Sequence, residues 1–136
     1  MIALLALAVL PRCADSFHLR WGAATQHLSP QRVEAVARVE SGCNLSPLLR
    51  AHACWNRVVR LRDCEVGRFQ IKPSTARARC RGLNVFTYSG NVACFFRMFG
   101  EDWARGGRTY ATLRHNGSGP GAEHYLALVD RAEDHL

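Results

Sequence analysis

Residues 29–42 read Ser-Pro-Gln-Arg-Val-Glu-Ala-Val-Ala-Arg-Val-Glu-Ser-Gly, and this one segment carries both end signals of a helix. Ser29 is a typical N-cap residue, and Pro30 suits the first helical position. Gly42 is typical of the residue just after a helix, where a left-handed backbone is common. The segment therefore predicts a helix that begins at Pro30 and ends near Ser41.

The apolar face of this helix ends in an acid. Val33, Val36 and Ala37 fall at i, i+3 and i+4, and the i+7 position of the same face is Glu40. A carboxyl group on such a face is usually paired or kept protonated by desolvation, and the negative end of the helix dipole also disfavours its charge. Both effects raise the pKa of the carboxyl group, as a general acid requires. The alternative is a glutamate that turns to the surface or pairs with an arginine.

Composition indicates a small, basic, globular domain. The chain has 136 residues, 48% of them hydrophobic, so it fits one domain with a real core and not a disordered chain. Its net charge is +7, and every basic residue except Lys72 is arginine. Such a surface suits a polyanion, namely nucleic acid, anionic lipid or an acidic cell-wall polymer. Genome composition would explain the arginine bias equally well.

The N-terminus resembles an export signal. Residues 2–10 are all apolar, a run that fits a signal-peptide core and is too short to span a bilayer, although no basic residue precedes it. We expect a signal peptide over 1–14 that ends at Ala14, and a mature domain over 15–136 that is periplasmic or secreted. Cleavage there would remove Cys13. The alternative is a buried N-terminal helix.

Six cysteines in so short a chain favour an oxidising compartment. No two of them form a C-x-x-C pair and their spacing fits no zinc pattern, so no metal site is expected. Full pairing would allow 15 connectivities. The pairs that we expect are Cys80 with Cys94, and Cys43 with either Cys54 or Cys64.

The rest of the chain reads as helices with one extended interruption. A second start signal at Ser46-Pro47 precedes apolar residues at helical spacing. Residues 65–71 have no helical period and predict a short β-hairpin that turns at Gly67. A helix then begins at Pro73 and ends at Gly82.

The clearest amphipathic helix lies over residues 92–103. Its apolar side chains recur at i, i+3, i+4, i+7 and i+11, which is typical of a core helix, and Gly106-Gly107 ends it. A shorter helix over 109–114, a glycine-rich loop over 116–121 and a last helix over 122–135 follow. The fold class predicted is all-α, as a single domain.

Three short motifs occur in order along the chain. They are Glu40-Ser41-Gly42; Gly-Arg-Phe-Gln-Ile-Lys-Pro-Ser-Thr-Ala over 67–76; and His-Asn-Gly-Ser-Gly-Pro-Gly over 115–121, followed by Tyr125. Over residues 29–129 they resemble the catalytic domain of soluble lytic transglycosylases, relatives of goose-type lysozyme. The resemblance implies an all-α (α+β lysozyme-like) fold, a single helical domain with a short β-hairpin beside the cleft.

The sequence departs from the pattern of this family in three places. Arg68-Phe69 stands where the family usually has Leu-Met, and His115 stands where it usually has tyrosine. The interval from Glu40 to Gln70 is longer than usual. These departures bear on substrate fit more than on the chemistry, because the acid is retained.

The resemblance also implies a site. Glu40 would protonate the glycosidic oxygen between N-acetylmuramic acid and N-acetylglucosamine, then act as base on the C6 hydroxyl, which gives a 1,6-anhydro end without cofactor or metal. The residues expected to bind the glycan are Ser41, Phe69, Gln70, His115, Asn116 and Tyr125. The residues themselves leave alternatives open. Gln70 could stabilise a turn, Phe69 could plug the core, Asn116 could adopt a left-handed turn conformation, His115 could be solvated, and Tyr125 could belong to the core with its hydroxyl at the rim.

Ordinary glycosidases use two carboxyl groups. In the central region only Asp63 and Glu65 could supply a second one, and we interpret both as solvated loop residues beside arginines. The nearest alternative function is a muramidase, which hydrolyses the same bond with water.

A non-catalytic cationic protein that binds cell wall or nucleic acid is the third possibility. Aromatic residues are not interleaved with the arginines as single-strand binders require, so nucleic acid is not expected. We expect a monomer that acts on peptidoglycan glycan strands, either for a cell or for a secretion, conjugation or phage apparatus.

Overall fold

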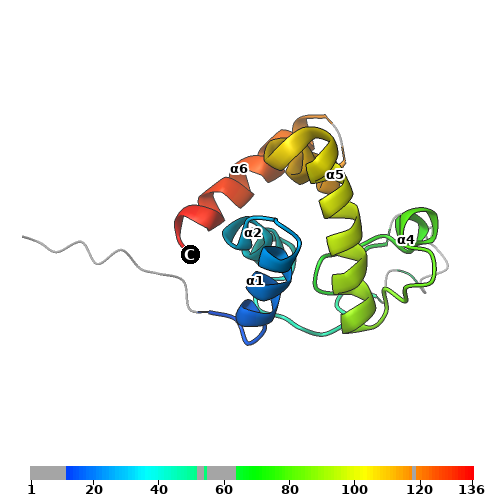
Figure 1. The fold of residues 1–136 in the computed structure, drawn as a ribbon. Helices are drawn as coiled ribbons and strands as arrows, with labels where there is room; N and C mark the ends of the chain where they lie inside the picture. The colour runs from blue at the N-terminus through cyan, green and yellow to red at the C-terminus, as the bar shows by residue number, and fades with distance from the viewer. Residues whose placement is uncertain (1–11, 52–53, 55–63, 118) are drawn as a thin grey trace, which may run out of the picture.

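The computed structural model describes residues 12–51, 54, 64–117 and 119–136. Within them the chain is helical, and α2 packs against α1 and α6, while α5 packs against α6 and α4 (Figure 1). The all-α prediction is confirmed at this level. The helices are α1 Ser16–Thr25, α2 Pro30–Ser41, α4 Pro73–Arg79, α5 Tyr88–Asn116 and α6 Pro120–Asp134.

Helix α2 forms as predicted. The Ser29 side chain accepts a hydrogen bond from the backbone N–H of Arg32 at 3.2 Å, and Pro30 occupies the first turn. Gly42 follows the helix with a φ of 61°, a conformation that glycine adopts without strain. Val33 and Val36 are fully buried, so the predicted apolar face is the face that packs in the core.

Helix α5 supplies the aromatic centre of the core. Phe95 is fully buried, and its ring stacks on Phe69 with centroids 3.7 Å apart and on Phe99 at 4.8 Å. The predicted glycine break is present as a kink at Gly107, where φ is 86°. The part of α5 beyond the kink leads to α6, and α6 packs against α5.

Three of the predicted helices differ from the structure. The start signal at Ser46-Pro47 gives turns through residues 47–51, with a left-handed φ of 61° at Arg50, and not a helix. In the rest of that expected helix the structure describes residue 54 alone, which is helical. Helix α4 ends at Arg79, before Gly82, and α6 already includes Gly121, which the sequence assigned to a loop.

The expected β-hairpin is reduced to a single antiparallel bridge between Val66 and Ile71, and no longer ladder forms among the described residues. The turn between them has positive φ at both Gly67 (77°) and Gln70 (46°), so the chain reverses too tightly for more pairs. A Cβ at Gly67 would lie 2.6 Å from Nδ2 of Asn91. Asn91 fixes the turn, because its Oδ1 accepts from the Phe69 N–H and its Nδ2 donates to the Val66 carbonyl, at 2.9 and 2.8 Å.

The disulfides use all six cysteines. The expected bond between Cys80 and Cys94 is confirmed, whereas the expected pairing of Cys43 is wrong. Their number indicates formation in an oxidising compartment. The three bonds join Cys13 to Cys43, Cys54 to Cys64, and Cys80 to Cys94.

The bond at Cys13 bears on the expected export signal. Cleavage after Ala14 would remove Cys13 and leave Cys43 without its partner. Any cleavage compatible with this disulfide therefore lies before Cys13. Residues 1–11, which carry the apolar run, lie outside the described residues. None of the helices described is long and apolar enough to cross a membrane.

Candidate active site

Glu40 lies in the last turn of α2, at the edge of the core. Its side chain is 13% exposed, so it is largely but not fully enclosed. Oε1 of Glu40 lies 3.3 Å from Nε2 of His115, near the C-terminal end of α5. The acid and the histidine of two separate sequence motifs therefore meet.

His115 has one ring nitrogen between two oxygen atoms. Nε2 lies 3.1 Å from the Phe69 carbonyl oxygen and 3.3 Å from Oε1 of Glu40, and a carbonyl oxygen can only accept a hydrogen bond. Nε2 therefore carries a proton and donates it. The imidazole is 7% exposed and lies edge-on to Phe95, with ring centroids 5.2 Å apart. The solvated-loop alternative for His115 is wrong, because the imidazole lies between the Phe69 carbonyl and the acid.

Tyr125 completes the inner side of this group. The residue is buried, and its hydroxyl makes no hydrogen bond of normal geometry within the described residues. Burial first, and then the nearby carboxylates of Glu40 and Glu65, raise the pKa of the phenol. Tyr125 is therefore a neutral phenol that faces the acid.

Glu65 is a second carboxyl group in the electrostatic field of Glu40. Loss of hydration and then the charge of Glu40 raise the pKa of Glu65, while Lys72 and His115 act in the opposite direction. The residue as a whole is exposed, yet the surrounding protein still removes enough water from its carboxyl group to shift the pKa. The interpretation as a solvated loop residue misses this proximity. Asp63 lies outside the described residues.

A small cavity of about 150 Å³ opens beside these groups. Pockets that enclose a whole small ligand have roughly 300–1,000 Å³, so this one fits a single substituent of a longer chain. It combines a carboxyl group, an imidazole, amides and cations, as a site for a polar polymer requires. Its lining residues are Glu65, Gln70, Ile71, Lys72, Thr75, Met98, Arg114, His115, Asn116 and Gly117.

The predicted glycan-binding residues are placed unequally. Gln70 and Asn116 line the cavity, but Nε2 of Gln70 also donates to the Gly67 carbonyl at 2.8 Å and stabilises the turn. Asn116 ends α5 in helical conformation, and Gly117 takes the positive φ of 121° instead. Phe69 is fully buried against Phe95, so it plugs the core and forms no wall for a sugar ring.

A buried ion pair next to Glu40 was not predicted. Arg68 has no exposed surface, and its Nε and Nη2 donate to the two carboxylate oxygens of Asp15 at 2.9 and 3.1 Å. The Tyr88 hydroxyl donates to the same carboxylate at 2.8 Å. Although burial alone would raise it, the hydrogen bonds from Arg68 and Tyr88 and the charge of Arg68 hold the pKa of Asp15 below its usual value.

The same guanidinium reaches the end of α2. Nη1 of Arg68 contacts the carbonyl oxygen of Ala37 at 2.9 Å, Oγ of Ser41 at 2.6 Å and the carbonyl oxygen of Gly42 at 2.6 Å. The Ser41 hydroxyl donates to the Arg68 carbonyl at 2.7 Å. Ser41, expected to bind glycan, thus uses its hydrogen bonds within the protein.

A second buried carboxylate, Glu34, ties α1 to α2. Ser16 donates to it at 2.5 Å, and Nε of Arg20 donates to its other oxygen. Burial would raise the pKa of Glu34, but the hydrogen bonds from Ser16 and Arg20 and the charge of Arg20 lower it on balance.

These two lowered pKa values predict acid sensitivity. A carboxyl group whose pKa is lower in the folded state stabilises the fold above its unfolded pKa, of about 4. That contribution is lost as pH falls through the folded pKa. We therefore expect the free energy of unfolding, measured with urea, to fall between pH 5 and pH 2. Asp15→Asn and Glu34→Gln should each flatten the profile, and a wild-type value that stays constant over this range would contradict the assignment.

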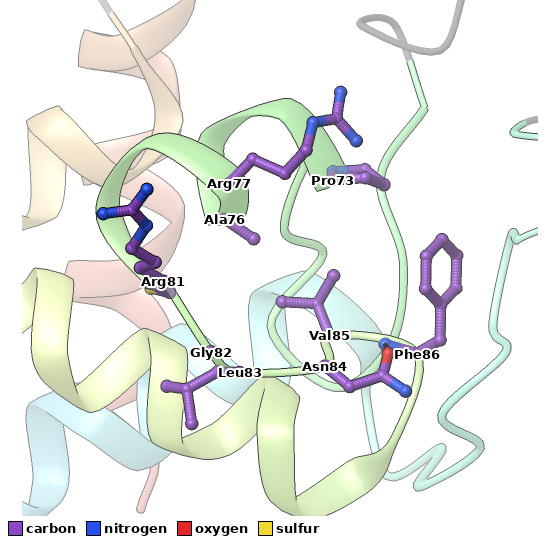
Figure 2. Close-up of a pocket in the computed structure, with 10 residues that line it drawn as sticks. Pro73, Ala76, Arg77, Arg81, Gly82, Leu83, Asn84, Val85 and Phe86 are labelled. Atoms are coloured by element: carbon purple, nitrogen blue, oxygen red, sulfur yellow. Dashed lines mark hydrogen bonds between the residues drawn. The ribbon is translucent and has the colours of Figure 1, made fainter.

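A larger pocket of about 380 Å³ lies between α4 and the segment over residues 81–86 (Figure 2). Arg77 and Arg81 line it, and Figure 2 shows that their side chains extend in different directions and do not converge. The lining contains no carboxyl group and no imidazole. This pocket offers no general acid, so the smaller cavity is the better candidate for catalysis.

The described part of the chain contains no group of histidine, cysteine, aspartate or glutamate side chains that could hold a metal ion. No model of a protein family, no curated protein and no solved structure matches this chain.

Proposed function

We propose that this protein is an exported lytic transglycosylase that cleaves the bond between N-acetylmuramic acid and N-acetylglucosamine in peptidoglycan. The observation that carries the proposal is the contact between Glu40 and His115, the second of which lines the polar cavity. One carboxyl group, oriented by an imidazole N–H and enclosed on its inner side, suits an acid that later acts as a base.

In the proposed reaction Glu40 gives its proton to the glycosidic oxygen as that bond breaks. The imidazole of His115 lies against Oε1, which leaves the other oxygen of Glu40 to hold the transferable proton. The resulting carboxylate then takes the proton of the C6 hydroxyl, whose oxygen bonds to C1 and forms the 1,6-anhydro end. This nucleophile already belongs to the substrate, so little orientation entropy is lost.

The lysozyme-like architecture belongs to the same proposal. It is supported by the helical fold and by the placement of the turn between Val66 and Ile71 against the end of α2. Gln70 on that turn and Asn116 beyond it would bind the glycan from the cavity.

Glu65 favours a second candidate, a muramidase. An ionised Glu65 close to Glu40 could stabilise the developing cation or activate water, as the second carboxyl group of ordinary glycosidases does. The transglycosylase needs no such group.

Mass spectrometry of peptidoglycan digested in heavy-oxygen water separates the two candidates. We expect unlabelled 1,6-anhydro ends from the wild type, and Glu65→Gln should keep its rate within about three-fold because only loss of a general acid or base costs ~10²–10⁴-fold. Heavy oxygen at the new muramic end, together with loss of activity in Glu65→Gln, would establish the hydrolase. No cleavage at all would contradict both.

Export and partners complete the proposal. Three disulfides suit a periplasmic or secreted protein, and the net charge of +7 suits an anionic wall. The proposed protein works as a monomer without a cofactor. Its partners are glycan strands, with a secretion, conjugation or phage apparatus as the setting.

A further inference from the structure

We propose that Arg68 and Asp15 are positioning residues for glycan cleavage, because they fix the end of α2, and with it Glu40, against the turn that also holds His115. The inference rests on the proposed function. Arg68 stands where the family resemblance predicts leucine, so the device is a feature of this chain.

The first step is that the Arg68 side chain binds residues that come before and after Glu40 in the sequence. Its Nη1 contacts the Ala37 carbonyl, three residues before the acid, and the Ser41 hydroxyl and Gly42 carbonyl, directly after it. Helix ends fray, and the last turn of α2 is the one that carries Glu40. The guanidinium supplies directional partners at the one turn whose position decides where the acid lies.

The second step is that the other member of the catalytic pair depends on the same short segment. His115 contacts the carbonyl oxygen of Phe69, the residue after Arg68, at 3.1 Å. One peptide unit therefore separates the group that holds Glu40 from the group that holds His115. Displacement of this segment would change the 3.3 Å separation between the carboxyl group and the imidazole.

The third step is that Asp15 orients Arg68. A fully buried guanidinium requires a counter-ion with matched geometry, and Asp15 binds it through two parallel hydrogen bonds. Asp15 is itself held by the Tyr88 hydroxyl and lies two residues after Cys13, which is bonded to Cys43. The N-terminal segment that carries Cys13 and Asp15 therefore holds Arg68 in place, and through Arg68 the end of α2.

The chain offers a matched control. Asp102 is 3% exposed, and Nη1 and Nη2 of Arg79 donate to its two oxygens at 3.1 and 2.9 Å. That pair joins α4 to α5 and touches no residue of α2. Asp15→Asn and Asp102→Asn therefore each remove a buried carboxylate that binds an arginine through two hydrogen bonds, and only the first pair is connected to Glu40. Arg79 is more exposed than Arg68 (26% against 0%) and also pairs with Glu101, so the control tests the loss of a two-fold hydrogen-bonded pair and not of a fully buried one.

The test measures kcat and KM on folded protein, with the fold checked by near-ultraviolet circular dichroism at low temperature. We expect Asp15→Asn and Arg68→Met to lower kcat by roughly 10–100-fold, in line with the effect of a displacement of about 1 Å, with KM within about three-fold. Asp102→Asn should keep kcat within about two-fold. Arg68→Lys keeps the positive charge but loses the planar guanidinium that binds Asp15 through two hydrogen bonds. Its kcat should therefore lie between those of Arg68→Met and the wild type.

The outcomes are distinct. If Arg68→Met does not fold, Asp15→Asn and Tyr88→Phe, which removes a single hydroxyl, decide the question. Folded variants of Asp15, Arg68 and Tyr88 with wild-type kcat, or an equal loss in Asp102→Asn, would overturn the positioning role while the proposed function stands. A wild-type protein that releases no glycan would overturn the proposed function and this role with it.

Discussion

Glu40→Gln is expected to lower the rate of glycan cleavage by roughly 10²–10⁴-fold, the usual effect of losing a general acid. The amide has the same shape as the carboxyl group, and its oxygen can still accept from His115, so the fold should persist. Stability should change little or rise, because a neutral amide of the same shape replaces a largely enclosed ionisable group. The measurement is the release of soluble fragments from purified peptidoglycan, with circular dichroism as the check on folding.

Glu123→Gln is the control for this experiment. Glu123 lies in the first turn of α6 and is exposed, so its substitution removes the same charge without touching the site. It should cleave at the wild-type rate. A Glu40→Gln protein that clears peptidoglycan within a few-fold of wild type would show that another group is the acid.

Reduction of the disulfides is expected to unfold the protein near 37 °C. Chain-entropy arguments assign about 3.6 kcal/mol to the bond that closes the 30-residue separation, and about 2.7 and 3.0 kcal/mol to those over 10 and 14 residues. The total of roughly 9 kcal/mol lies within the range of 5–15 kcal/mol that covers the whole stability of most domains. Thermal unfolding with and without reductant measures the effect.

Two further measurements sharpen this prediction. Protein recovered from the periplasm or medium should have no thiol that reacts with an alkylating agent before reduction, and six afterwards. Among double cysteine-to-serine variants, loss of the bond between Cys13 and Cys43 should lower stability most, because it closes the longest loop. Six reactive thiols in untreated protein would contradict both expectations.

The helices that the sequence predicted well are those whose signals agree. In α2 the caps, the period and the burial of Val33 and Val36 all point the same way. Helix α1 has no such agreement. Phe17 and Trp21 are 78% and 64% exposed, while the face that packs in the core carries Leu19 and Ala23. The largest apolar side chains of α1 lie on its exposed face, so the spacing of apolar residues does not predict this helix or its buried face.

The residues of the candidate site also divide into those that the sequence predicted and those that only the fold brings together. Glu40 lies at a fixed offset on a helix face, and short motifs directed attention to His115 and Tyr125. The pairing of Arg68 with Asp15 spans 53 residues. Nothing local distinguishes Arg68 from the other arginines, so only the fold selects it. The nearness of Glu65 to Glu40 likewise depends on how the turn after it packs.

The disulfide between Cys13 and Cys43 delays completion of the folded structure until after synthesis. Cytosolic thiols keep cysteines reduced. A newly made chain therefore lacks this disulfide until it reaches an oxidising compartment. Until then, the segment that carries Asp15 is joined to the end of α2 by non-covalent contacts alone. An enzyme that cuts the cell wall would damage the cell that makes it, and under the proposed function this delay protects the producer during synthesis.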